Sequence, residues 1–281
     1  MIDIDPHLES NYNLVAARGG VDDVMQRWSA ASASLRAQVD ASLDCAYGSD
    51  ERERIDVFRS GAKHAPLYVY LHGGYWQRGD KSLYSFIAAP FLAAGVDVAI
   101  VGYPLCPQVS MTELLDKIRQ SIGWLYHNAK QLDINRERIN LSGHSAGGHL
   151  VAMGVCTDWP GCDPKLPQDL LKSAIPLSGL YQLKPLLQTS ISEALHLTDS
   201  EVIELSPAAL QPATQIPLLT IIGGAETAEL FHQTDLLVDS WCAWLPQIER
   251  HVEAGVDHFD LIDRLASSDS RVFQRILGWL R

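Results

Sequence analysis

Nearly continuous apolar runs alternate with amphipathic stretches along the 281 residues of this chain. Segments 67–71 and 96–101 are almost wholly apolar, which is typical of strands buried on both faces of a sheet. Segments 82–94 and 110–129 are predicted to be helices, and the second has apolar residues at helical spacing. This alternation predicts a mostly parallel, doubly wound sheet with helices on both faces.

The remaining predicted elements extend the alternation to the end of the chain. An amphipathic helix is predicted before the sheet at 21–39, and residues 54–59 alternate like an edge strand. Further strands are predicted at 138–142, 173–178, 216–222 and 248–253, and further helices at 146–155, 227–244 and 259–280, the last broken near 267–269. We therefore expect one α/β domain over residues 1–281, a length that suits single α/β domains of about 250 residues.

The stretch from about 156 to 212 departs from this pattern. Its prolines interrupt short helical pieces, at Pro160, Pro164, Pro167, Pro185, Pro207 and Pro212. Because proline breaks a helix, we expect only short helices there. We expect a small helical cap, inserted between strands rather than folded as a separate domain.

Charge and hydropathy limit the partners of the chain. A formal net charge of -12, with no run of Lys or Arg, argues against nucleic acid, because phosphate binding needs a basic face. Residues 1–10 lack the apolar stretch of a secretory signal, and no segment has about 18 uninterrupted apolar residues. We expect a cytoplasmic protein with no membrane partner. The sequence leaves its oligomeric state open, with a homodimer as one option.

The cysteines and histidines give no indication of a metal or other cofactor. The five cysteines lack the close pairs of zinc and redox motifs. His144 and His149 are five positions apart, which would place them on different faces of a helix, and no His-Glu-x-x-His motif is present. We expect reduced cysteines and an enzyme without a metal.

The clearest chemical signal is Gly-His-Ser-Ala-Gly at residues 143–147, between a predicted strand and a predicted helix. A serine in such a turn is the nucleophile elbow of the α/β-hydrolase fold. The turn strains the backbone of the serine, and glycines two residues away on either side prevent clashes. We therefore predict the α/β-hydrolase fold, with Ser145 as the nucleophile.

A second motif, His-Gly-Gly-Tyr-Trp at residues 72–76, follows another predicted strand. In this fold that loop can present backbone N–H groups to the nucleophile, and adjacent glycines allow close approach to a developing oxyanion. We assign the oxyanion hole to Gly73, Gly74 and the N–H of Ala146. His72 is expected to brace the loop rather than to act as a base.

The general base should come late in the chain, because this fold orders its triad as serine, acid and histidine. His258 follows the strand predicted at 248–253 and precedes a helix. His251 lies inside that strand and His232 inside a helix, so both fit less well.

The acid should follow the strand predicted at 216–222, where Glu226 stands. Its carboxylate would accept the imidazole N–H and stabilise the imidazolium. Glu229, one helical turn further, and Asp257, next to the histidine in sequence, are the alternatives.

These motifs resemble the kynurenine formamidase (arylformamidase) branch of the esterase- and lipase-like α/β-hydrolases. Residues 72–76 look like its oxyanion motif, and Tyr-Pro-Leu-Cys-Pro at 103–107 is similar to its Tyr-x-Leu-x-Pro turn. Residues 11–13 and 46–48 resemble its N-terminal signatures. Gln182 departs from the pattern, since relatives often have Asp there. The resemblance implies hydrolysis of N-formyl aromatic amides.

Three aromatic residues, Tyr75, Trp76 and Tyr181, follow strand ends at the carboxyl edge of the predicted sheet, where ligands bind in open α/β folds. We expect them to line a pocket for an aromatic leaving group, with simple packing as the alternative. The leading hypothesis is a serine hydrolase of small acylated aromatic amides or esters such as N-formylkynurenine. The alternatives are a short-chain carboxylesterase and a non-catalytic ligand-binding protein on a hydrolase scaffold.

Overall fold

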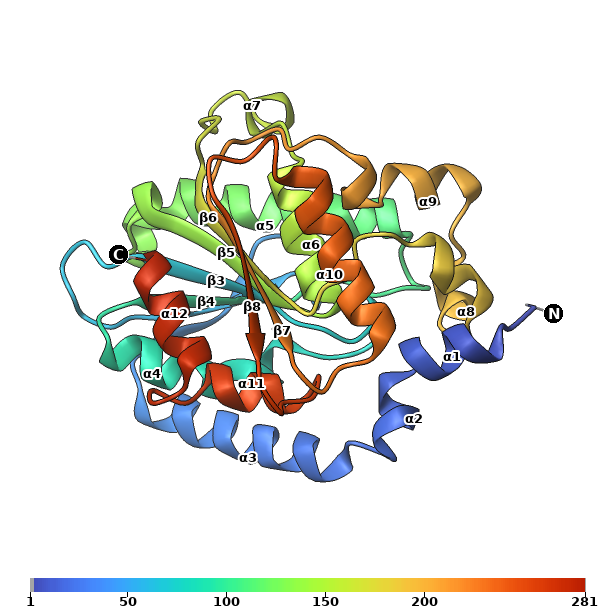
Figure 1. Cartoon of the computed structure of the whole chain (residues 1–281). Helices are drawn as coiled ribbons and strands as arrows, with labels where there is room; N and C mark the ends of the chain where they lie inside the picture. Colours follow the sequence, from blue (N-terminus) through green and yellow to red (C-terminus); the bar gives the residue numbers. More distant parts are fainter. Residues whose placement is uncertain (1–2, 281) are drawn as a thin grey trace.

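Eight strands form a sheet at the centre of the computed structural model, which describes residues 3–280 (Figure 1). Their order is β1-β2-β4-β3-β5-β6-β7-β8. β2 pairs antiparallel with both β1 and β4, and the other neighbouring pairs are parallel. The predicted mostly parallel sheet is therefore confirmed. The strands are β1 (Ala41–Ala46), β2 (Arg54–Phe58), β3 (Leu67–Leu71), β4 (Asp97–Val101), β5 (Ile139–His144), β6 (Leu171–Leu177), β7 (Leu218–Gly223) and β8 (Ile248–Glu253).

Helices cover both faces of this sheet, as predicted. One face carries α5 (Met111–Leu132), α6 (Ala146–Val155) and α10 (Ala228–Trp241), and the other carries α3 (Asp22–Gln38), α4 (Ala88–Ala93), α11 (Asp260–Leu265) and α12 (Arg271–Leu280) (Figure 1). Successive side chains of β3 point to opposite faces. Leu67, Val69 and Leu71 pack with the first group, whereas Tyr68 and Tyr70 pack with the second. The two faces thus hold two separate apolar cores.

The segment predicted as an edge strand is not at the edge. β1 pairs outside β2, so the edge position predicted for residues 54–59 is wrong. The sequence of β1, Ala-Ser-Leu-Asp-Cys-Ala, has few large apolar residues, and its side chains are half-buried or exposed. A strand of this kind lacks the buried face that a hydrophobic pattern can reveal.

Residues 156–212 contain β6 and short helical pieces on two sides of the molecule. α7 (Trp159–Cys162) lies at one end, whereas α8 (Ser192–Leu195) and α9 (Asp199–Glu204) lie toward the N-terminal helix α1 (Pro6–Tyr12) (Figure 1). The short 3-10 helices are η1 (Lys81–Ile87), η2 (Arg136–Arg138), η3 (Lys184–Gln188) and η4 (Pro207–Ala209), and α2 (Leu14–Arg18) links α1 to α3. The backbone N–H of Asp5 donates to the carbonyl of Gln188 at 2.9 Å, which joins the N-terminal segment to this stretch.

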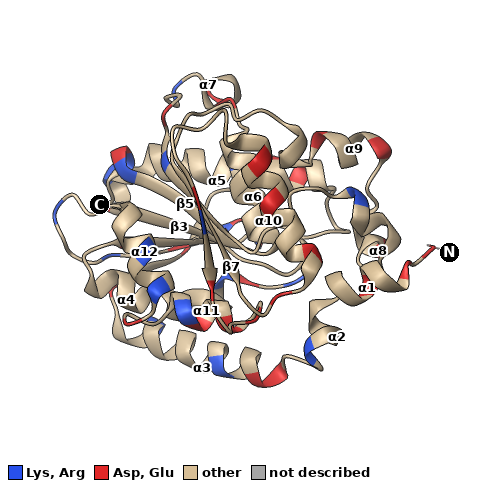
Figure 2. Ribbon diagram, viewed as in Figure 1, with Lys and Arg blue, Asp and Glu red and all other residues tan. Residues whose placement is uncertain are grey.

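Charged side chains gather on the outer helices and loops, whereas the central strands carry few (Figure 2). Among the described residues, no helix is both long and apolar enough to cross a membrane. The cytoplasmic location and the oligomeric state stay predictions.

Candidate active site

Ser145 occupies the turn between β5 and α6, with a backbone φ of 58° and ψ of -119°. Such a conformation strains the backbone of a non-glycine residue, and it persists here because the turn is closely packed between β5 and α6. A Cβ on Gly147 would lie 2.0 Å from the carbonyl oxygen of Leu71, and one on Gly143 would lie 2.5 Å from that of Gly147. Only glycine therefore fits on either side of the serine, as the elbow interpretation requires.

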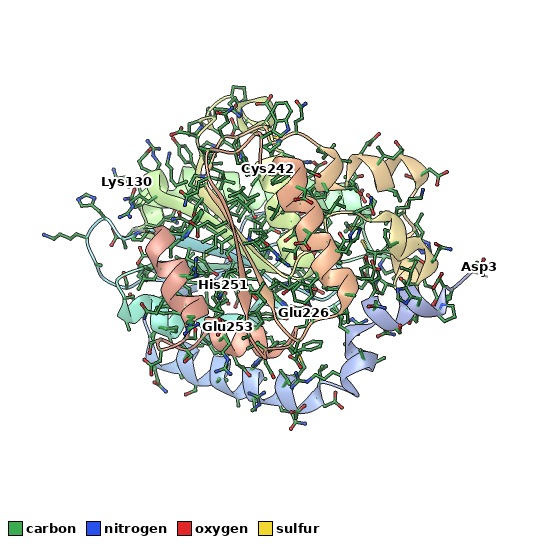
Figure 3. The ribbon with its side chains drawn as sticks, viewed as in Figure 1. Asp3, Lys130, Glu226, Cys242, His251 and Glu253 are labelled. Carbon is green, nitrogen blue, oxygen red and sulfur yellow. The ribbon has the colours of Figure 1, made fainter. Side chains whose placement is uncertain are left out.

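His258 and Glu226 meet across the ends of β7 and β8. The Nδ1 of His258 lies 2.8 Å from Oε2 of Glu226. The side chain of Glu226, which is labelled in Figure 3, is fully buried. Because a carboxylate only accepts, Nδ1 carries the proton and Nε2 is left as the acceptor. The other oxygen of Glu226 accepts from the hydroxyl of Ser178 and from the backbone N–H of Gly223 at 3.3 Å. These contacts fix the carboxylate and, through it, the imidazole ring.

The rival acids and bases have other partners. Glu229 accepts from the hydroxyl of Tyr12 at 3.1 Å, and Asp257 pairs with Arg18. His251, inside β8, has its Nε2 2.9 Å from Glu253 (Figure 3).

Ser145 and His258 line the same pocket, which has a volume of about 250 Å³. Most of its wall is apolar, and much of it comes from residues near the N-terminus. The lining residues are Leu14, Val15, Val21, Met25, Trp28, Gly73, Gly74, Tyr75, Arg78, Gly79, Leu83, Tyr84, His144, Ser145, His258 and Phe259. Within the described chain, no residue of 156–212 contributes to this wall.

The glycine loop after β3 approaches the serine closely. A Cβ on Gly73 would lie 3.1 Å from Cβ of Ser145. Gly74 has a φ of 118°, and its carbonyl accepts from the backbone N–H of Arg78 at 3.0 Å. Nδ1 of His72 lies 2.8 Å from the carbonyl oxygen of Gly73, so this histidine braces the loop as predicted. Burial lowers the pKa of His72 to about 4, which keeps the ring neutral.

Comparison with known proteins gives one consistent result. A family model described as BD-FAE matches residues 55–166. The kynurenine formamidase of Salmo salar is 30% identical over 246 residues, which cover 84% of this chain and 80% of that protein. The chain belongs to the kynurenine formamidase family of α/β-hydrolases. The Drosophila melanogaster kynurenine formamidase is 28% identical, covering 80% of this chain and 77% of the relative.

Solved structures agree with this hydrolase assignment. A candidate thioesterase from Silicibacter sp. tm1040 is 31% identical, with a TM-score of 0.84 over 97% of this chain and 98% of that one. Esterase B of Lactobacillus rhamnosis is 17% identical, with a TM-score of 0.71 over 96% of each chain. The second likeness shows the fold alone, which is the predicted α/β-hydrolase fold.

The three aromatic residues expected in the substrate pocket of this hydrolase are placed differently from one another. Tyr75 lines the pocket, and its hydroxyl donates to the carbonyl oxygen of Tyr12. Trp76 and Tyr181 are fully buried and do not belong to the described pocket wall. The ring of Trp76 packs edge-on against His149, with the ring centroids 5.0 Å apart. Trp76 and Tyr181 therefore pack in the core, which was the alternative expected for these three residues.

Sequence reasoning missed two of the aromatic residues that line the pocket, Trp28 of α3 and Tyr84 of η1. Phe259, directly after His258, lines it as well. Apolar positions on an amphipathic helix signal burial but not what they are buried against. Only the packing of α3 across the site identifies Trp28 as a wall residue.

Sequence reasoning considered His144 only as a metal ligand, but its place is beside His258. Its ring lies against that of His258, with centroids 4.2 Å apart. Burial, together with the neighbouring His258, holds the pKa of His144 well below its usual range. A neutral ring therefore packs against His258, which lines the same pocket as Ser145. Among residues 3–280, no group of three His, Cys, Asp or Glu could hold a metal ion.

Proposed function

We propose that this hydrolase cleaves N-formyl aromatic amides, with Ser145 as the nucleophile, His258 as the base and Glu226 as the acid. The observation that carries the proposal is the bond between Glu226 and His258, which leaves Nε2 as an acceptor beside a pocket shared with Ser145. The kynurenine formamidase family supports the same substrate class.

The reaction follows from these positions. His258 Nε2 takes the proton of Ser145 as Oγ bonds to the formyl carbon, and the carbonyl electrons move to oxygen. The tetrahedral intermediate then collapses, the C–N bond breaks, and the imidazolium protonates the leaving arylamine. Water, deprotonated by His258, then attacks the formyl ester on Ser145. The C–Oγ bond breaks, the imidazolium returns its proton to Oγ, and the formic acid released ionises to formate. Glu226 stabilises the imidazolium in both halves of the reaction.

The developing oxyanion would be held by the N–H groups of Gly73, Gly74 and Ala146. The close approach of Gly73 to Ser145 supports this assignment. Ala146 is the first residue of α6, where N–H groups have no partner within the helix and the dipole favours negative charge.

The pocket wall supports an aromatic leaving group with an anionic substituent. Trp28, Tyr84 and Phe259 offer aromatic surface. Arg78 is the only lining residue, among those described, that is a Lys, Arg, Asp or Glu. Its side chain is exposed at this wall, so it can pair with a carboxylate on the substrate. N-formylkynurenine combines an N-formyl arylamine with a carboxylate, and it is the first substrate to test.

Steady-state kinetics on formyl, acetyl and butyryl anilides and the matching phenyl esters test this proposal. We expect measurable formanilide hydrolysis and a kcat/KM that falls as the acyl chain lengthens, because overfilling a tight acyl site costs about 1–3 kcal/mol. Turnover of the esters alone, with the butyryl ester preferred to the formyl ester, would replace the formamidase assignment with a carboxylesterase.

Two controls complete the experiment. Ser145→Ala should lose both turnover and labelling by a fluorophosphonate while keeping its fold. Retained labelling in that variant would overturn the role of Ser145. N-formylkynurenine and its methyl ester differ in the carboxylate charge and in one methyl group, and Arg78→Gln should reduce the preference for the free acid. An unchanged preference would show that Arg78 does not pair with the substrate carboxylate.

A further inference from the structure

We propose that Arg52 is a positioning residue for the oxyanion donors, although it lies in the turn before β2 and outside the described pocket wall. The inference rests on the proposed function, because it assumes that the N–H groups of Gly73 and Gly74 bind the oxyanion. It assigns to Arg52 the task of holding the glycine loop at its working distance from Ser145.

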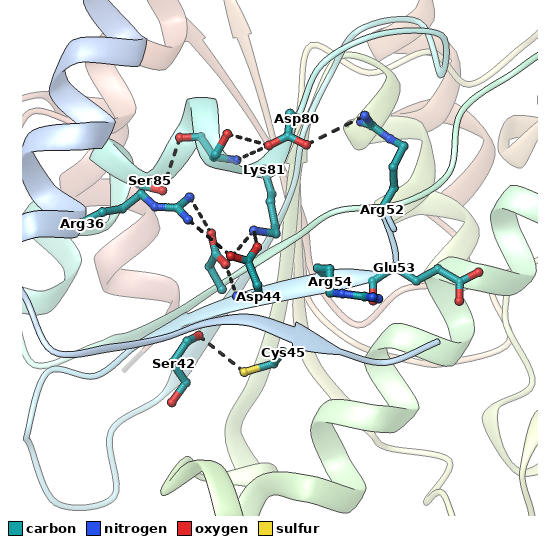
Figure 4. Close-up of polar contacts among 12 residues, drawn as sticks. Arg36, Ser42, Asp44, Cys45, Arg52, Glu53, Arg54, Asp80, Lys81 and Ser85 are labelled. Atoms are coloured by element: carbon teal, nitrogen blue, oxygen red, sulfur yellow. Dashed lines mark hydrogen bonds and ion pairs between the residues drawn. The ribbon is translucent and has the colours of Figure 1, made fainter. Parts of the chain in front are cut away.

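The guanidinium of Arg52 joins two backbone segments. Its Nη2 donates to the carbonyl oxygen of Gly79, and its Nε donates to that of Tyr103 at 3.1 Å. Its Nη1 lies 3.9 Å from the carboxylate of Asp80 (Figure 4). A guanidinium presents several donors in a rigid fork, so it can set the spacing between two carbonyl groups.

Both acceptors lie directly against the start of the glycine loop. A Cβ on Gly79 would lie 2.8 Å from the carbonyl oxygen of Gly73 and 2.9 Å from Nδ1 of His72. On the other side, the hydroxyl of Tyr103 donates to the carbonyl oxygen of His72 at 2.6 Å, and their rings stack with centroids 4.2 Å apart. Arg52 therefore joins the two residues that enclose His72 and Gly73. A movement of Gly79 or Tyr103 must displace the proposed oxyanion donors.

A buried ion-pair cluster anchors the end of the same loop. Lys81, only 5% exposed, has its Nζ 2.5 Å from Asp44 and 2.7 Å from Asp56 (Figure 4). Asp56 also pairs with Arg36 of α3 at 2.9 Å. The loop end is thus fixed to β1, β2 and α3, and Arg52 supplies the support between this anchor and Gly73.

Kinetics of Arg52→Gln and Arg52→Lys test the proposal on any substrate that the wild type turns over. We expect Arg52→Gln to lower kcat by about 10- to 100-fold with little change in KM, because small misplacements of catalytic groups cost up to about 100-fold. Arg52→Lys should recover part of this loss, since an ammonium keeps the charge but not the fork. The affinity for an aryl boronate, whose oxygen would occupy the oxyanion hole, should fall in parallel with kcat/KM.

The matched control is Arg59→Gln at the same edge of the sheet. Arg59 pairs with Asp40 at 3.0 Å and donates to Ser42 at 2.9 Å, and none of its contacts in the described chain reaches residues 72–80. Its substitution removes the same charge and should leave kcat unchanged.

Three results would overturn the inference: wild-type kcat in Arg52→Gln, a change confined to KM, or an equal loss in Arg59→Gln. If Arg52→Gln does not fold, Arg52→Lys decides, because unchanged kcat and boronate affinity in that variant would exclude the positioning role. Failure of the proposed function is distinct, because it shows as a wild type that does not cleave formyl arylamides.

Discussion

Two irregular segments flank the sheet of this hydrolase, and only one of them encloses the pocket. The N-terminal segment contributes five residues to the pocket wall, whereas the proline-rich stretch 156–212 contributes none of the described lining. These five are Leu14 and Val15 of α2, Val21 just before α3, and Met25 and Trp28 of α3. The sequence favoured the second segment as the cap. The location of a segment relative to the carboxyl ends of the strands, and not its irregular sequence, decides whether it covers the site.

Both segments are built into the cores of the protein. In the N-terminal segment Tyr12 and Val24 are fully buried, and in the 156–212 stretch Leu183 and Leu186 are fully buried. The N-terminal segment also makes polar contacts to α11, including the bond from Nε1 of Trp28 to Asp263 at 2.7 Å. The two segments therefore differ in whether they border the pocket, and not in how firmly they are packed.

The largest expected effect separates the proposed acid from Glu229, which contacts the N-terminal segment. Glu226→Gln should lower kcat by about 1,000- to 10,000-fold, because a neutral amide cannot stabilise the imidazolium of His258. Glu229→Gln should change kcat little, since its carboxylate accepts from Tyr12 of α1. Steady-state kinetics of both variants check this, and a reversed pair of effects would move the acid to Glu229.

The residues that carry the proposed chemistry could be predicted because each lies in the turn or loop that follows a predicted strand. Ser145 sits in a short motif with a steric requirement, and the chain order of the fold then directs attention to Glu226 and His258. β3, α6 and β8 lie at their predicted bounds. For β3 the reason is its continuous apolar pattern, which marks a strand buried on both faces.

The pocket wall could not be predicted in the same way, because it depends on contacts between distant parts of the chain. Trp76 follows the strand end beside Tyr75, yet it is fully buried while Tyr75 lines the pocket. No feature of the local sequence distinguishes Tyr75 from Trp76 in this respect. Trp28 reaches the site only because α3 packs along η1, and its ring lies 5.7 Å from that of Tyr84. Arg52 gives no motif at all, since its partners are backbone carbonyls.

A smaller effect should appear in the pH dependence of stability, through the attachment of 156–212 to α6. Nε2 of His149 lies 2.8 Å from the carbonyl oxygen of Leu205, and burial lowers the pKa of His149 to about 4. The unfolded chain, with a pKa near 6.5, binds this proton first as pH falls. The stabilisation is therefore complete above about pH 6.5 and is lost toward pH 4.

Between pH 7 and 5 this histidine should account for a loss of about 2 kcal/mol in the free energy of unfolding. Urea unfolding at both pH values checks this. His149→Gln should show a pH-dependent loss that is smaller by that amount, whereas His232→Gln, an exposed substitution on α10, should match the wild type. Equal losses in wild type and His149→Gln would contradict the assignment.

The smallest effect tests the comparison of the two segments directly. Met25 of α3 is half-buried and lines the pocket, whereas Ile203 of α9 is 68% exposed and lies outside the described pocket wall. Met25→Ala removes apolar surface from the wall and should lower kcat/KM for phenyl formate by roughly fivefold, which corresponds to about 1 kcal/mol of lost contact. The loss should be smaller for methyl formate, because its leaving group is too small to reach α3, and Ile203→Ala should leave both substrates unaffected. Steady-state kinetics of the wild type and the two variants on both formates measure these differences. An equal loss for phenyl and methyl formate would show that Met25 acts through stability rather than through the leaving group. A loss in Ile203→Ala would show that the 156–212 stretch does contribute to substrate binding.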